Sequence, residues 1–155
     1  MLSVLVVAPM ARAQKPPAPR WEDVAAYYSG GNMKGDILYD WLNTNGTTGM
    51  PGSGNIRLNP KLKESRDAFL KGIGAKDYAH RRASVVLGLP FLSTLIHESL
   101  HNRTNSAGLD FGAEAAPTDL GTRLVPDLLQ RFFGVKMDSR LGKEVTEMVL
   151  KNLRR

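Results

Sequence analysis

Length, composition and charge limit the classes to which this chain of 155 residues can belong. Its 42% hydrophobic and 23% charged residues are typical of one globular domain, and no apolar stretch reaches the roughly 20 residues that span a bilayer. Because cysteine is absent, disulfides, thiolate metal ligands and a cysteine nucleophile are excluded. The net charge of +6 favours acidic partners, but no aromatic residues interleave with the dispersed basic ones, so we favour a solvated surface over a nucleic-acid site.

The first 20 residues are predicted to form a strand or arm followed by a proline-rich linker, and residues 21–155 the main domain. Residues 2–7 are apolar and suit a buried strand. They also resemble the core of a signal peptide, but no Lys or Arg precedes them and the run is very short. We therefore expect an uncleaved segment, and the sequence assigns no compartment.

The elements expected next along the chain are short. Residues 21–28 suit a helix, and residues 37–42 form another brief apolar segment. Residues 43–55 are rich in Gly, Asn, Thr and Ser, which predicts an exposed loop. The alternating residues 56–58 predict a strand that ends before Pro60.

Helical patterns dominate the second half. Residues 60–73 are predicted to form a helix that buries Leu62, Phe69 and Leu70, whereas residues 78–89 are compatible with a strand or a helix. Pro90 suits the first turn of a further helix, because the missing N–H of proline costs nothing there. The core-facing residues of that helix are expected to be Leu92, Leu95, Ile96 and Leu100.

Further helices are predicted at residues 117–124 and 126–133, the latter ended by Gly134, and near the C-terminus. The last helix is expected to pack through Leu141, Val145, Met148 and Val149. Together with the short strands, these helices indicate a mainly helical α+β domain with a small sheet.

The segment with the clearest chemical pattern is His97-Glu98-Ser99-Leu100-His101. Residues four apart lie on the same face of a helix, so His97 and His101 can converge on one metal ion. Glu98 lies about 100° around the helix, beside that face, where it can reach a water molecule at the ion. Two surface histidines beside a carboxylate are the alternative interpretation, but two of only three histidines fall in this motif.

This HExxH helix resembles that of the zincin metallopeptidases, of the gluzincin or small SprT-like kind. The resemblance covers about residues 55–124 and implies a zincin-like domain with the motif helix at its centre. It also implies a Zn²⁺ cofactor, a protein or peptide substrate, His97 and His101 as zinc ligands, and Glu98 as the catalytic general base.

The resemblance extends to the short strand before the motif helix. In the family, a sheet edge beside the cleft commonly pairs with an extended peptide. On this resemblance, main-chain atoms of Ile56, Arg57 and Leu58 would bind substrate.

A catalytic zinc site needs a third protein ligand and one open position. The third histidine of metzincins has no counterpart in residues 102–112. Gluzincins use a following glutamate, which makes Glu114 the preferred candidate, and Asp119 could orient a ligand imidazole from outside. The spacing of five between them departs from the four of the best-known gluzincins, so Asp119, Asp110 and His80 stay alternatives as ligands.

The function expected from this motif is zinc-dependent hydrolysis of peptide bonds. A residue that stabilises the oxyanion is not identified; Tyr78, His80 and Arg123 are weak candidates. The alternative is a zincin-fold structural or assembly subunit of a large complex such as a phage particle, with an inactive site, because the chain is short for a free-standing peptidase. A nucleic-acid-associated module, suggested by the positive charge, ranks third.

Overall fold

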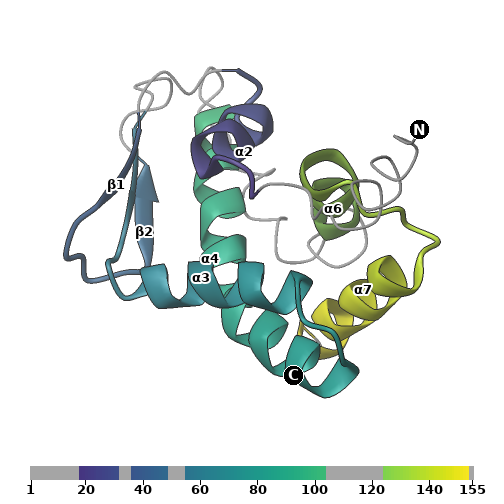
Figure 1. The fold of residues 1–155 in the computed structure, drawn as a ribbon. Coiled ribbons are helices and arrows are strands. Elements are labelled where there is room, and N and C mark those ends of the chain that lie inside the picture. Colours follow the sequence, from purple (N-terminus) through teal and green to yellow (C-terminus); the bar gives the residue numbers. More distant parts are fainter. Residues whose placement is uncertain (1–17, 32–35, 49–54, 104–123, 154–155) are drawn as a thin grey trace, which may run out of the picture.

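The computed structural model describes residues 18–31, 36–48, 55–103 and 124–153, and these form a mostly helical α+β fold with one small mixed sheet (Figure 1). The expected α+β class is therefore confirmed. Residues 1–17 of the predicted arm and linker lie outside the described residues. The same is true of Asp110, Glu114, Asp119 and Arg123. The elements in chain order are α2 (Trp21–Tyr28), β1 (Ile37–Tyr39), β2 (Gly46–Thr48), β3 (Ile56–Leu58), α3 (Leu62–Ile73), α4 (Tyr78–Arg103), α6 (Val125–Phe133) and α7 (Arg140–Leu153).

The sheet has the strand order β1-β3-β2, with β1 parallel and β2 antiparallel to β3. The predicted strand at residues 56–58 is confirmed, and its alternation places Ile56 and Leu58 in the core and Arg57 in solvent. Two expectations are wrong. Residues 46–48 form β2 rather than a loop, and β3 lies in the centre of the sheet rather than at its edge, because strands pair with it on both sides.

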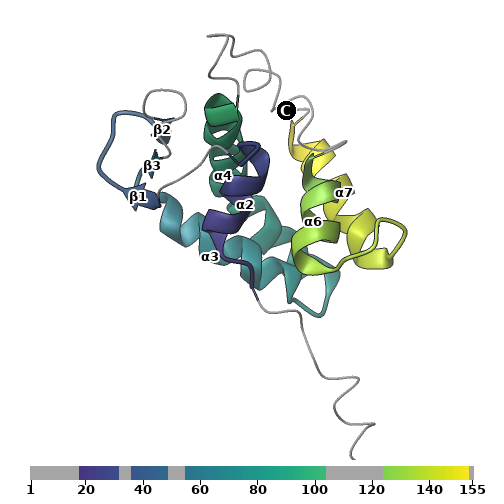
Figure 2. The ribbon, with the colours of Figure 1, turned by 90° about the horizontal axis from the view of Figure 1, so that it is seen from above.

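Helix α4 runs through the middle of the molecule, with the sheet on one side and α6 and α7 on the other (Figures 1 and 2). Four side chains of its second half, Phe91, Leu92, Leu95 and Ile96, are fully buried. By length and composition alone, residues Tyr78–Asn102 could also cross a membrane, but 56% of the most apolar window is buried by the rest of the fold. That burial is what a central core helix requires.

Pro90 lies inside α4, so the prediction that a helix begins there is wrong. Proline cannot donate the usual backbone hydrogen bond, and it disturbs the preceding turn. The hydroxyl of Ser65 on α3 bridges this turn: the Phe91 N–H donates to Ser65 Oγ at 3.0 Å, and Ser65 Oγ donates to the Leu87 carbonyl at 2.7 Å. The neighbouring helix thus keeps α4 continuous, and residues 78–89, which suited either a strand or a helix, are helical.

Two glycines allow α3 and α4 to lie close enough for this bridge. A Cβ added at Gly72 would lie 2.7 Å from the Val85 nitrogen, and one added at Gly88 would overlap Phe69. Neither glycine has a positive φ angle, so each is needed for space and not for its backbone conformation.

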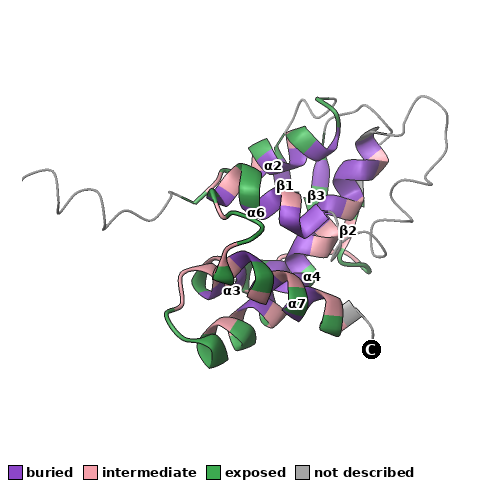
Figure 3. Ribbon diagram, turned by 90° about the vertical axis from the view of Figure 1, so that its right-hand side faces the viewer, coloured by how far each residue is buried: buried purple, intermediate pink, exposed green. Residues whose placement is uncertain are grey.

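The remaining helices close the core around α4. Trp21 of α2 lies edge-on to Phe91, with ring centroids 5.0 Å apart. The Tyr28 hydroxyl donates to the Leu124 carbonyl at 3.2 Å and to Asp127 at 3.0 Å, which joins α2 to α6. Gly134 ends α6 with a φ of 64°, as predicted. Figure 3 shows the resulting division between buried inner faces and exposed outer turns of α3 and α7.

Candidate metal centre

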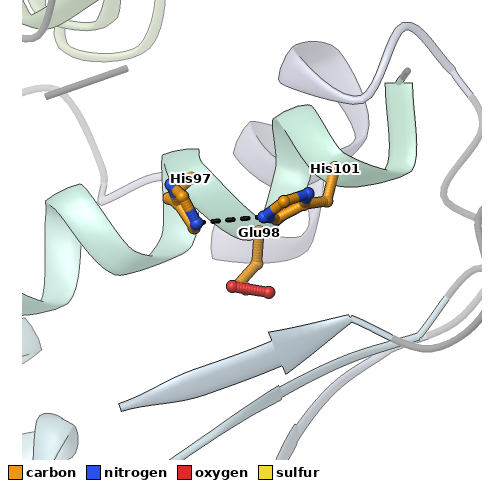
Figure 4. Close-up of side chains that lie close together, drawn as sticks. All are labelled: His97, Glu98 and His101. Atoms are coloured by element: carbon orange, nitrogen blue, oxygen red, sulfur yellow. Dashed lines mark hydrogen bonds between the residues drawn. The ribbon is translucent and has the colours of Figure 1, made fainter. Parts of the chain in front are cut away.

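The two motif histidines converge on the exposed side of the last turns of α4. The Nε2 atoms of His97 and His101 are 3.0 Å apart, and the rings meet edge to face with an interplanar angle of 86° (Figure 4). Both side chains are half-buried. The sequence predicted this convergence correctly, because it follows from the spacing of four residues on a helix.

The separation of the two nitrogens fits a zinc ion. Bonds of about 2.0–2.1 Å at a tetrahedral angle place two ligand nitrogens about 3.3 Å apart. The observed 3.0 Å differs from this by a small rotation of the rings. Imidazole nitrogen is a common zinc ligand, so His97 and His101 can supply half of a four-coordinate site.

Glu98 completes the cluster from the buried side. Its side chain is only 6% exposed, and one carboxylate oxygen lies within 4.8 Å of the ligand nitrogens of both histidines. Its carboxylate points toward the sheet, whereas the histidine rings point toward each other (Figure 4). A carboxylate so placed can accept a proton from a water molecule held between it and the histidines.

The turns that carry the motif are held in place by the core. Leu95, Ile96 and Leu100 anchor the opposite side of the helix, and the fully buried Ser99 donates its hydroxyl to the Leu95 carbonyl at 2.7 Å. Side chains on well-packed turns lose few alternative conformations when they bind a ligand. The histidines therefore project from a rigid base.

Strand β2 lies against the motif helix, a feature that the sequence prediction missed. A Cβ added at Gly46 would lie 2.7 Å from Thr94 Cγ2 and 3.2 Å from Glu98 Cγ, so the strand backbone lies close to the side-chain stem of Glu98. The start of β2 is fixed by the buried Asn59, whose backbone N–H donates to Asn45 O at 2.7 Å and whose amide donates to Leu42 O at 3.0 Å. The signal in the sequence was weak, because a Gly-Thr-Thr stretch within a glycine-rich region is more typical of a loop.

His80 is not a ligand of this site. It lies seventeen positions before His97 on the same helix, which corresponds to about 25 Å along the helix axis. Instead, its Nδ1 pairs with Asp77 Oδ2 at 2.5 Å in solvent. Tyr78 lies farther still along the helix, which also removes both residues as oxyanion stabilisers.

The other predicted site residues divide into two groups. Glu114, Asp119, Asp110 and Arg123 lie outside the described residues, so the identity of the third ligand stays a prediction. Ile56, Arg57 and Leu58 are described, and their strand is paired on both sides, to β1 and β2. Their main chain therefore has no free edge to which a peptide could add, whereas their substrate-binding role itself stays a prediction.

Comparisons with known proteins give this geometry no family name. No protein-family model, curated protein or solved structure matches the chain. What is shown is a His97-Glu98-His101 cluster with HExxH spacing that could hold a metal ion.

Proposed function

We propose that this protein is a zincin-type zinc metallopeptidase. The observation that supports the proposal best is the convergence of His97 and His101 Nε2 at 3.0 Å beside the buried carboxylate of Glu98. In the absence of an ion, the same 3.0 Å separation lets one ring donate an Nε2–H hydrogen bond to the other, so the two rings are already held together. The third ligand that we propose is a carboxylate, Glu114 in preference to Asp119.

The proposed reaction is hydrolysis of a peptide bond, in which the protein residues have separate roles. His97 and His101 would hold the ion, which, when bound, acidifies water and polarises the scissile carbonyl. Glu98 accepts a proton from the attacking water while the oxygen of that water bonds to the carbonyl carbon. The same carboxyl group then donates that proton to the nitrogen of the breaking C–N bond, which leaves as an amine.

The test is to measure bound zinc and peptide cleavage in the wild type and in Glu98→Gln. We expect about one zinc per chain in both proteins, and a fall in kcat of about 10²–10⁴-fold in the variant, because the general base is lost. Glu64→Gln, which alters an exposed acid on α3, is the matched control and should cleave normally.

A wild-type protein that binds no zinc would contradict the proposal. Zinc retained without cleavage of any peptide would instead favour the alternative, a zincin-fold assembly subunit with an inactive site.

A further inference from the structure

The contact between Gly46 of β2 and the motif helix carries a further inference, which rests on the proposed function. Gly46 has no positive φ angle, so its backbone conformation does not require glycine. Glycine is instead required for lack of space, because an added Cβ would meet Thr94 Cγ2 at 2.7 Å, Leu58 Cδ2 at 3.1 Å and Glu98 Cγ at 3.2 Å. The missing side chain therefore lets β2 lie directly on the stem of Glu98.

Thr94 forms the fixed wall of this contact. It precedes Glu98 by four residues, so the two side chains share one face of α4. Its hydroxyl donates to the Pro90 carbonyl at 2.7 Å, which holds the rotamer that presents the methyl group to Gly46. The methyl group cannot turn away from an added Cβ without loss of that hydrogen bond.

We propose that Gly46 is a positioning residue for Glu98: its backbone, seated against Thr94, confines the stem of Glu98 and aligns the carboxylate with the two histidines. Gly46 touches neither the ion nor the reacting atoms in this role. A displacement of about 1 Å in a catalytic group can lower the rate by as much as 100-fold. The distance from β2 to α4 therefore sets the catalytic rate.

The test is a set of variants at positions 46 and 94. Gly46→Ala should lower kcat by roughly 10–100-fold while zinc content stays at the wild-type level, because the histidines lie outside the contact. Thr94→Ser removes the methyl group and keeps the hydroxyl. The double variant Gly46→Ala/Thr94→Ser removes the closest of the three contacts, so it should recover part of the lost kcat and part of any loss in Tm.

Gly72→Ala is the matched control, because its added Cβ would also lie 2.7 Å from its nearest neighbour on α4, the Val85 nitrogen, but away from the motif. It should lower Tm without lowering kcat per folded molecule.

If the wild type is active and Gly46→Ala is equally active, the positioning role of Gly46 is overturned but the proposed function is not. A loss of kcat that Thr94→Ser does not rescue, or that Gly72→Ala shares, would overturn it as well. A wild type without zinc or cleavage would overturn the proposed function, and with it this inference, so the two failures are distinguishable.

Discussion

Helix α4 carries two groups of histidine and carboxylate, one at each end, and they differ in surroundings. At its start, the side chains of His80 and Asp77 are 81% and 59% exposed and pair at 2.5 Å. Toward its end, His97 and His101 are half-buried and Glu98 is only 6% exposed. The same residue types thus occur once in solvent and once against the core.

The two groups share their residue types but differ in geometry and burial. Asp77 accepts the His80 backbone N–H at 3.0 Å and therefore acts as a helix cap. The second group has two imidazoles at the required spacing, a carboxylate shielded from solvent and a strand packed beside it. Low local polarity strengthens electrostatic interactions, so we expect a metal ion to bind at the second group and not at the first.

The largest expected effect tests this contrast directly. His101→Ala removes one of the two converging nitrogens. Loss of a residue that only hydrogen-bonds to a metal ligand lowers metal affinity by roughly 10–100-fold, so loss of a ligand itself should lower zinc affinity by more than this. His80→Ala, its matched control at the other end of α4, should bind zinc as the wild type does. Calorimetric titration with zinc measures both. Equal losses in the two variants would show that the motif histidines do not form the site.

An intermediate effect is expected at the join between the two halves of α4. Ser65→Ala removes the hydroxyl that bridges Leu87 O and Phe91 N, and the loss of hydrogen bonds at this exposed to part-buried position should cost about 0.5–1.5 kcal/mol. Urea unfolding measures the change in the free energy of unfolding. Ser84→Ala on the adjoining face of α4 is the control, with an expected change within about 0.5 kcal/mol. An unchanged Ser65→Ala would mean that α4 remains continuous without the bridge.

The smallest effect is expected at the cap. The pKa of Asp77 is lowered, first by the His80 backbone N–H and then by the His80 side chain. A depressed folded-state pKa contributes stability above the unfolded value near 4, and this stability is lost as pH falls through the folded-state pKa.

Asp77→Asn should therefore lower Tm by on the order of 2 °C at pH 7 and by less in acid. Thermal scans across pH measure the difference, with Asp138→Asn, an exposed acid, as the control. A Tm difference that is constant with pH would contradict this account of Asp77.

The parts of the fold that the sequence predicted correctly depend on local spacing. The helix at residues 126–133, its stop at Gly134 and the convergence of His97 with His101 all follow from positions a few residues apart. Wrong predictions depend on distant partners instead. Pro90 was expected to begin a helix because Ser65, 25 positions earlier, could not be known to complete the turn.

The sheet shows the same limit. Whether β3 lies at an edge depends on which segments pair with it, and the alternation of Ile56, Arg57 and Leu58 reports only which side faces the core. The glycine-rich pattern around Gly46 predicted a loop, but the segment is a strand that lies close to Thr94 and Glu98. The motif itself was predictable, but the surroundings that position its carboxylate were not.

The hydroxyl bridge from Ser65 also bears on the order in which the chain folds. In a peptide of residues 78–103 alone, the Leu87 carbonyl and the Phe91 N–H would lack the Ser65 hydroxyl, and we expect the helix to be weakest at Pro90. Docking of α3 therefore stabilises the junction between the first half of α4 and the motif turns. Formation of the candidate metal centre is thereby coupled to assembly of the α3–α4 pair.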